Sequence, residues 1–225
     1  MSRVLITGVS RGIGEGLLRI YLENGHEADA IGRSAPEWAA AHVARFRFHT
    51  CDLADANALV EVSRAIATPL DTLICSAGDF GSDAHLLGQF DNAAFVRAFA
   101  VNCIAPAILA RELKPRLEEG ARRHIVFMST GNASLGGNTS GEMLAYRTSK
   151  SALNQLMRNI AAEWGPQGFT AVALNPGWVR TDMGGENAPL SVEEAAAEIH
   201  AFCEDAMDKA LNGRFCNTDG SELPW

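Results

Sequence analysis

The sequence predicts an α/β fold in which about seven parallel strands form one doubly wound sheet with helices on both faces. Two observations lead to this prediction. Short apolar runs rich in Val, Ile, Leu, Ala and Phe alternate with longer segments of helical periodicity through most of the chain. No internal repeat, low-complexity tract or Pro/Ser-rich linker divides the 225 residues. We therefore expect a single domain, residues 1–225, with its ligand site at the carboxyl ends of the strands.

Each element follows from this alternation in chain order. The apolar runs predict strands at residues 3–7, 27–32, 45–51, 72–76, 124–129, 170–175 and 214–216. The segments between them predict helices at residues 12–23, 36–44, 55–67, 91–119, 144–164 and 192–211. Gly165-Pro166 and Asn212-Gly213 end the last two helices. Pro115 is expected to end or kink the helix at 91–119 near Lys114.

Composition and charge exclude several classes of partner. The chain has 19 Lys and Arg residues against 27 Asp and Glu, a net charge of −8, so no general positive field attracts a nucleic acid. The N-terminal residues MSRVLITG lead directly into a strand and do not resemble a signal peptide. No apolar segment is expected to approach the roughly 18 to 20 residues that cross a bilayer. We expect a cytoplasmic protein with no nucleic-acid or membrane partner.

Cysteine and histidine spacing gives no sign of a metal centre. The five cysteines lack a CxxC pair, and some lie within apolar runs, so buried free thiols are expected. The six histidines show no ligand spacing such as HExxH. We therefore expect no metal site.

A glycine-rich turn follows the first predicted strand. Residues 7–14 read TGVSRGIG, which places Gly8, Gly12 and Gly14 where the strand turns into a helix. Residues without a Cβ let backbone N–H groups approach a pyrophosphate at the positive end of the helix. The spacing GxxxGxG differs from the common GxGxxG fingerprint, and a tight turn without a ligand is the alternative. The position of the turn, in the first strand–helix unit, favours a nucleotide site.

The end of the second predicted strand indicates which dinucleotide binds. It reads AIGRS, with Arg33 near the place where an acidic residue would bind a ribose 2′-hydroxyl. A guanidinium there can pair with a 2′-phosphate, and Arg11 in the glycine turn can face the same phosphate. We therefore predict that NADP(H) is favoured over NAD(H); the alternative is that both arginines are merely solvated. The sequence offers no explanation for Asp29, in the middle of this strand.

Tyr146 and Lys150 lie four residues apart near the start of the helix predicted at 144–164, which puts both side chains on one face. A free tyrosine has a pKa of about 10 and is a poor proton donor or base near neutral pH. An ammonium group about 4 to 6 Å away favours the phenolate and lowers this pKa. The pair therefore predicts acid–base chemistry, against the alternative of two exposed residues on a helix surface.

An ordered series of motifs runs through most of the chain. It comprises TGVSRGIG at 7–14, CDL at 51–53, ICSAG at 74–78, VNCIAP at 101–106, FMST at 127–130, YRTSK at 146–150 and NPGWVRTDM at 175–183. In order and spacing, the series resembles that of the short-chain dehydrogenase/reductases, a family with a Rossmann-type fold. The segments GNTSGEMLAYRTSKSALN, GWVRTDMGGENAPLSVEEAA and NTDGSELPW are similar to its C-factor-like and sniffer-like carbonyl reductase branch.

The resemblance implies an NADP(H)-dependent oxidoreductase that acts on a small carbonyl compound or alcohol. Tyr146 would be the general acid in carbonyl reduction and the base in the reverse reaction, and Lys150 would hold the nicotinamide ribose. Thr130 would donate a hydrogen bond to the substrate oxygen, and Asn102 would order a water that links Lys150 to solvent. The implied cofactor-binding residues are Gly8, Ser10, Arg11, Gly12, Ile13, Gly14, Arg33, Asp52, Leu53, Ser76, Ala77, Gly78, Asn102, Tyr146, Lys150, Pro176, Gly177, Val179 and Thr181.

The chain departs from the family pattern in three places. Cys75-Ser76 replaces the usual Asn-Asn before Ala77-Gly78, and Thr130 replaces the second serine of the usual Ser-Ser pair. The loop between that pair and the tyrosine is longer than in many members. This longer loop leaves Ser129 and Ser134 as alternatives to Thr130 for the role of hydroxyl donor.

The resemblance also implies an assembly and an alternative function. The helices at 91–119 and 144–164 resemble those that build a dimer interface in the family, so a homodimer or homotetramer is expected. The alternative to an enzyme is a cofactor-binding signalling or sensor protein of the C-factor type, in which catalysis is incidental. The substrate does not follow from the sequence, because residues 184–190 have little distinctive chemistry.

Overall fold

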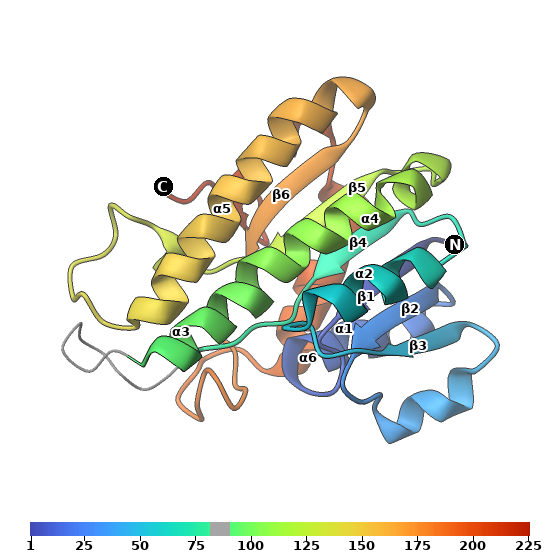
Figure 1. Ribbon diagram of the computed structural model, residues 1–225, viewed down its shortest axis with the longest axis horizontal. Helices are drawn as coiled ribbons and strands as arrows, with labels where there is room; N and C mark the ends of the chain where they lie inside the picture. The colour runs from blue at the N-terminus through green and yellow to red at the C-terminus, as the bar shows by residue number, and fades with distance from the viewer. Residues whose placement is uncertain (82–90) are drawn as a thin grey trace.

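The computed structural model describes residues 1–81 and 91–225, and it contains a sheet of seven parallel strands (Figure 1). The strand order is β3-β2-β1-β4-β5-β6-β7, so the chain builds outward in one direction from β1 and then in the other from β4. The strands are β1 (Arg3–Thr7), β2 (Glu27–Gly32), β3 (Phe46–Thr50), β4 (Thr72–Cys75), β5 (His124–Met128), β6 (Thr170–Asn175) and β7 (Phe215–Asn217). The predicted fold class is confirmed.

Helices cover both faces of the sheet, because side chains alternate between the two faces along each strand. In β1, Leu5 packs into the core on one face, whereas Val4 and Ile6 pack into the core on the other. The helices over the first face are α2 (Ala56–Ala65), α4 (Ala105–Glu119) and α5 (Leu144–Trp164), and those over the second are α1 (Gly12–Glu23) and α6 (Val192–Ala201). Figure 1 shows α2, α4 and α5 in front of the strands, with α1 and α6 behind them.

Three helical segments follow one another without a break before β5. The first, α3 (Asn92–Phe99), continues through a π-helical turn at Ala100–Ile104 into α4. Of the two alternatives predicted for Pro115, an end of the helix is wrong, because α4 continues to Glu119 beyond the proline; a kink stays a prediction. Leu113 and Leu117 flank Pro115 and are fully buried in the core. Their burial stabilises the last turn although the proline supplies no N–H group.

The same run corrects a second expectation. Asn92–Glu119 comprises 28 helical residues and contains an 18-residue window with a mean hydropathy of 1.8, so one segment of the described chain does reach membrane-spanning length by length and composition. In the fold this run lies against α2, α5, β4 and β5, and 44% of the window is buried. Its apolar character is therefore consistent with a helix that contacts both the sheet and two neighbouring helices.

Two predicted helices are shorter than expected. The segment 36–44 forms a 3₁₀ helix at Glu37–His42 that buries only Ala39, which is too little apolar surface to stabilise a longer α-helix. The segment 192–211 divides into α6, a π-helical turn at Phe202–Ala206 and a 3₁₀ helix at Lys209–Leu211. Asp208 separates the last two, because its side chain accepts a hydrogen bond from the backbone N–H of Ala210 and starts a new turn.

Asp29, in the middle of β2, is buried and has two charged or polar partners. Its Oδ2 lies 3.2 Å from Nη1 of Arg3, and its Oδ1 lies 3.0 Å from Nε2 of His49. These partners come from β1 and β3, the two strands that flank β2. The pairing explains a residue that the sequence leaves unexplained, because a buried carboxylate is costly unless it is paired.

Candidate active site

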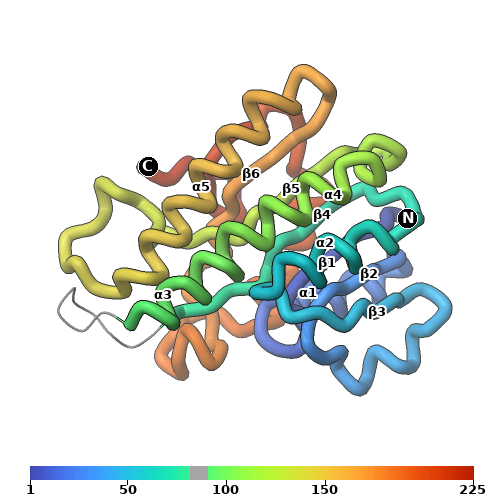
Figure 2. Tube along the Cα trace, viewed as in Figure 1, coloured from blue at the N-terminus to red at the C-terminus, as the bar shows by residue number. Residues whose placement is uncertain are grey.

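Because the strands are parallel, the turns that follow them lie at one end of the sheet (Figure 2). A cavity of about 410 Å³ opens there, between the glycine turn after β1 and the segments that follow the strands β2 to β6. The predicted residues that line this cavity are Gly8, Ser10, Arg11, Gly12, Ile13, Gly14, Arg33, Asp52, Leu53, Ser76, Ala77, Gly78, Tyr146, Lys150, Pro176 and Thr181. The fold thus brings most of the predicted cofactor-binding residues together.

Four predicted residues lie outside this lining. Asn102 and Thr130 are immediately behind it, since each contacts a residue that lines the cavity. Gly177 lines a neighbouring cavity beside β7. Val179 is buried and forms an isolated bridge with Leu190. The segment after β6 therefore reaches the cavity through Pro176 and through residues beyond Val179.

The glycine turn leaves space for backbone only. Gly8 has a φ of +77°, and a Cβ there would lie 2.8 Å from the Cα of Ala77. A Cβ on Gly14 would lie 2.3 Å from the carbonyl oxygen of Gly8. The residue before α1, Arg11, does not cap the helix with its side chain. Among the described residues, no side chain accepts a hydrogen bond from the first N–H groups of α1. This arrangement of free N–H groups suits a phosphate.

Polar and cationic groups around the turn also suit an anionic ligand. Arg33 is exposed at the end of β2 and forms no ion pair with any described residue. Arg11 pairs with Asp182 at 2.7 Å, and both side chains are largely exposed. Within the described chain, the Oγ of Ser76 is buried without a hydrogen-bond partner. The donors that line the cavity therefore fit a dinucleotide with charged phosphates.

Helix α5 places Tyr146 and Lys150 on one side, as the spacing predicts. Lys150 is buried; its Nζ donates a hydrogen bond of 2.6 Å to the carbonyl oxygen of Met128 and lies 5.9 Å from the centre of the Tyr146 ring. Burial lowers the pKa of Lys150 to about 8. The ammonium group of Lys150 therefore lies near the ring of Tyr146, while its hydrogen bond is directed to Met128.

The acidity of Tyr146 differs from the sequence-based expectation. Burial raises the pKa of Tyr146, and a hydrogen bond from the Thr130 hydroxyl only partly offsets this effect. The expectation that Lys150 lowers this pKa is therefore wrong for the cofactor-free structure. The physical reason is that burial removes the phenol from water, while the ammonium group of Lys150 donates its hydrogen bond to Met128.

Of the three hydroxyl groups considered as hydrogen-bond donors to substrate, Thr130 is the one that contacts Tyr146. The Oγ of Ser129 donates a hydrogen bond of 2.6 Å to Oδ1 of Asn154. The Oγ of Ser134 donates a hydrogen bond of 3.1 Å to the carbonyl oxygen of Trp225. Both serines are buried, and Ser129 lines the cavity together with Tyr146. Because the hydroxyls of both serines are bonded elsewhere, we assign the role of donor to Thr130.

Asn102 is fully buried in the π-helical turn and joins two parts of the site. Its Nδ2 donates to the carbonyl oxygen of Asp79 at 2.7 Å and to Oγ of Ser149 at 2.9 Å, and its Oδ1 accepts from the N–H of Asp79 at 2.8 Å. The hydroxyl of Ser149 donates in turn to the carbonyl oxygen of Tyr146 at 2.9 Å. Asn102 thus ties the chain after β4 to the start of α5. Its role in ordering a water stays a prediction.

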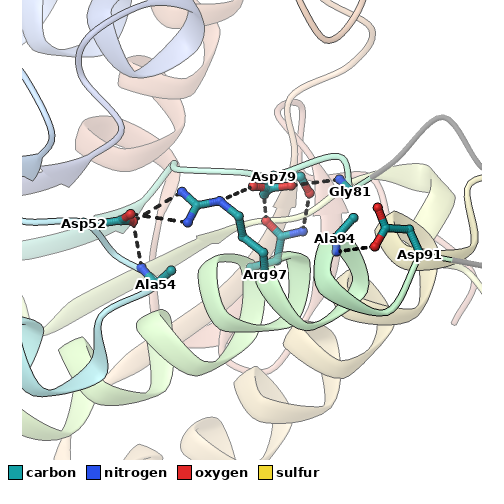
Figure 3. A network of polar contacts seen from close by, with 8 residues as sticks. Asp52, Ala54, Asp79, Gly81, Asp91, Ala94 and Arg97 are labelled. Carbon is teal, nitrogen blue, oxygen red and sulfur yellow. Dashed lines mark hydrogen bonds and ion pairs between the residues drawn. The ribbon is translucent and has the colours of Figure 1, made fainter.

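Four charged residues that line the cavity are not among the site residues predicted from the sequence: Asp79, Arg97, Arg180 and Asp182. Asp79 follows β4, Arg97 lies on α3, and both line the cavity. Figure 3 shows the guanidinium of Arg97 between the carboxylates of Asp52 and Asp79. The position of Asp79 directly after ICSAG is a local signal that could have indicated it. No local pattern could pair Arg97 with Asp52, because 45 residues separate them.

Comparison with known proteins identifies the family. The short chain dehydrogenase family matches residues 2–190 of the chain. The chain belongs to this family. The match confirms the resemblance predicted from the motif series, and it makes the protein an NAD(P)-dependent oxidoreductase of the short-chain dehydrogenase/reductase class.

Individual relatives specify the branch of the family. The C-signal protein of Myxococcus xanthus is 37% identical over 167 residues, which cover 72% of this chain and 99% of that protein. The carbonyl reductase Sniffer of D. melanogaster is 30% identical, with a TM-score of 0.92 and full coverage of both chains. A carbonyl reductase from Pseudomonas aeruginosa PAO1, solved in complex with NADP, is 34% identical, with a TM-score of 0.82 and full coverage of both chains. The predicted C-factor-like and sniffer-like branch is confirmed.

Proposed function

We propose that this short-chain dehydrogenase transfers hydride between NADP(H) and a small carbonyl compound or alcohol, with Tyr146 as general acid and base. The observation that carries the proposal is the placement of Tyr146, Thr130 and Lys150 beside a cavity whose glycine turn presents free backbone N–H groups. The carbonyl reductases among the structural relatives support the same reaction class.

The chain supplies the proton and the hydrogen bonds, whereas a bound nicotinamide would supply the hydride. Because its pKa is raised, Tyr146 is protonated at neutral pH and can donate its proton to a carbonyl oxygen as the carbon is reduced. Thr130, which lies beside this phenol, would turn its hydroxyl proton to the same substrate oxygen and stabilise the developing charge. Lys150 holds the ribose of the nucleotide from the same side of α5. In the reverse direction, the Tyr146 phenolate takes the proton from an alcohol.

Substitution of Tyr146 by Phe tests this proposal. Loss of the phenolic proton is expected to lower kcat for carbonyl reduction by roughly 10²- to 10⁴-fold, with the Kd for NADPH nearly unchanged. NADPH oxidation against a panel of aldehydes and ketones is the measurement. The matched control is Tyr21→Phe at the other tyrosine of the chain, which is buried in the core away from the cavity. Undiminished turnover in Tyr146→Phe, or no turnover by the wild type on any substrate, would contradict the proposal.

We further propose a preference for NADP(H) over NAD(H), because Arg33 is a cation at the ribose end of the cavity without an ion-pair partner among the described residues. Arg33→Ala is expected to lower the ratio of kcat/KM for NADPH to that for NADH by roughly tenfold or more, since a charge-assisted contact with the 2′-phosphate is lost. Steady-state kinetics with both cofactors measure the ratio. An unchanged ratio contradicts the assignment.

A signalling role is the second candidate, and the 37% identity to the C-signal protein of Myxococcus xanthus supports it. In that case the bound cofactor would set the conformation, and turnover would be incidental. A Gly14→Asp variant separates cofactor binding from other functions, because any side chain at Gly14 collides with the carbonyl oxygen of Gly8. Signalling retained without cofactor binding would exclude this candidate. The presence of Tyr146 and Lys150 at the cavity favours the enzyme.

We also propose a homodimer or homotetramer in the cytoplasm. The assembly is supported by exposed apolar side chains, including Val96 and Ile104, on the run that contains α3 and α4. The proposed cytoplasmic location is supported by the five cysteines, which are all free thiols, as expected in a reducing environment. Cell fractionation tests the location, and recovery in an oxidising compartment would overturn it.

A further inference from the structure

Arg97 on α3 connects two carboxylates that come from different loops of the cavity (Figure 3). Its Nη1 and Nη2 each donate a hydrogen bond of 3.3 Å to the carboxylate of Asp52, and its Nε lies 3.2 Å from Oδ2 of Asp79. Asp52 follows β3 and Asp79 follows β4, and all three side chains line the cavity. The planar guanidinium therefore joins the loops after two strands that are not neighbours in the sheet.

The positions of both carboxylates are set by further hydrogen bonds. Oδ1 of Asp52 also accepts from the backbone N–H of Ala54 at 3.0 Å. Oδ1 of Asp79 accepts from the N–H of Gly81 at 2.8 Å, and the backbone of Asp79 is held at both its N–H and its carbonyl by Asn102. The contacts thus continue from Asp52 through Arg97 and Asp79 to Asn102, which is bonded to the start of α5.

These ion pairs contribute little to folding. The side chains of Arg97 and Asp52 are 41% and 43% exposed, and ion pairs that remain in water stabilise a fold by about 0 to 1 kcal/mol. Their consequence for an anionic ligand is larger. Asp52 and Asp79 each bring a negative charge to a cavity that must accept the phosphates of a dinucleotide, and Arg97 is the cation that contacts both.

We propose that Arg97 is a positioning residue for the cofactor: it neutralises Asp52 and Asp79 and holds the loops after β3 and β4 in the arrangement that admits a dinucleotide. The inference rests on the proposed function, because it requires that the cavity binds NADP(H). It assigns no part in proton or hydride transfer to Arg97. The residue acts through Asp52 on the loop after β3 and through the Asp79–Asn102 contact on the loop after β4.

The experiment compares wild type, Arg97→Gln and Arg97→Lys by fluorescence titration with NADPH at low and high salt, together with kcat, KM and thermal unfolding. Arg97→Gln is expected to raise the Kd and the KM for NADPH roughly tenfold at low salt, and less at high salt, because the exposed carboxylates are then screened. We expect kcat to change less than about twofold and the Tm of the cofactor-free protein to stay nearly constant. The Kd and the KM of Arg97→Lys for NADPH should lie between those of the wild type and of Arg97→Gln, because lysine retains the positive charge but lacks the planar guanidinium.

Two further variants test whether the loss of NADPH affinity in Arg97→Gln comes from uncompensated charge, and whether it is specific to an arginine at the cavity. In the Arg97→Gln background, Asp79→Asn removes one uncompensated charge and is expected to recover part of the lost affinity; no recovery would overturn the charge-balancing role. Arg64→Gln is the matched control, because Arg64 is an exposed arginine paired with Glu112 outside the cavity. Its Kd for NADPH should equal that of the wild type.

The outcomes distinguish this inference from the proposed function. If the wild type binds NADPH and Arg97→Gln binds it equally well, the inference is overturned while the proposed function stands. If the wild type binds no dinucleotide at all, both are overturned. A raised Kd that does not depend on salt and that accompanies a large fall in Tm would show a structural role, which also overturns the inference.

Discussion

At the scale of single residues, the site depends on how burial shifts proton equilibria. Tyr146 and Lys150 are both surrounded by protein, and burial raises the pKa of the phenol while it lowers the pKa of the ammonium group. Both shifts favour the neutral form of the side chain. A proton donor for carbonyl reduction is thereby present at neutral pH, whereas alcohol oxidation requires a phenolate that burial disfavours.

The buried ammonium group of Lys150 predicts a specific pH dependence of stability. Between the folded pKa of about 8 and the ordinary value of 10.5, the unfolded chain holds the proton that the folded chain has lost, so stability rises with pH across this window. Below pH 8 the full cost of burying the charge is present. Lys150→Met is therefore expected to stabilise the cofactor-free protein at pH 7 by about 3 kcal/mol, less the contribution of the lost hydrogen bond to Met128, and this gain should shrink as the pH rises from 8 to 10.5.

Thermal unfolding of both proteins across this pH range measures the difference. Contributions from cysteines that do not interact with Lys150 cancel in it, whereas those of Cys75 and Cys103, which do, are part of the difference. The control is Lys209→Met, because Lys209 is exposed and its substitution should give a difference that does not change with pH. A Lys150→Met difference that stays constant from pH 7 to 10.5 would contradict the shifted pKa.

At the scale of elements, the loop between β5 and α5 owes its shape to the end of the described chain. Ser134 lies at the centre of this contact: its Oγ donates to the carbonyl oxygen of Trp225 and accepts from the N–H of Gly137 at 3.0 Å. The N–H of Gly136 also donates to the Trp225 carbonyl at 3.0 Å. The Trp225 ring lies 5.6 Å from the ring of Phe215 in β7. The loop that begins at Thr130 is thus anchored to the far edge of the sheet.

Ser134→Ala tests this anchor. The substitution leaves a backbone N–H and part of a carbonyl without partners, and it is expected to destabilise the fold by about 1 to 2 kcal/mol. Amide hydrogen exchange should become faster in residues 134–141, and KM for substrate should rise more than kcat falls, because the loop borders the proposed substrate position. Ser140→Ala is the control: it removes only an exposed acceptor for the N–H of Glu142, and it should leave stability, KM and exchange in residues 134–139 unchanged. Equal exchange rates in wild type and Ser134→Ala would refute the anchoring role.

At the scale of the whole molecule, exposed apolar side chains on the helical run Asn92–Glu119 predict association of copies. Val96 and Ile104 are 67% and 49% exposed on the run that leads from α3 into α4. Light scattering at micromolar concentration is expected to give a dimer or tetramer, and Ile104→Glu is expected to shift the protein toward the monomer by placing a charge in the interface. Val43→Glu, at another exposed apolar residue, should leave the mass unchanged. If the wild-type protein is monomeric at micromolar concentration, the proposed dimer or tetramer is wrong.

Most of the fold could be predicted because its signals are local. The seven strands are short apolar runs, and their separation by helical segments requires parallel pairing. The sequence-based predictions of helix length were wrong where contacts with the rest of the fold determine how long a helix is. Pro115 lies inside α4 because the core holds its flanking leucines, and the segment 36–44 forms only a 3₁₀ helix because it buries one alanine.

For the site, the sequence by itself determined which chemical groups are present: a glycine-rich turn after β1, a tyrosine and a lysine one helical turn apart, and an arginine after β2. These follow from the spacing of residues along single elements. The tertiary structure alone decided which hydroxyl stands beside Tyr146, that its pKa rises rather than falls, and that Arg97 joins Asp52 to Asp79. The physical reason is that burial and charge pairing depend on groups brought together across the sheet, from positions far apart in the chain.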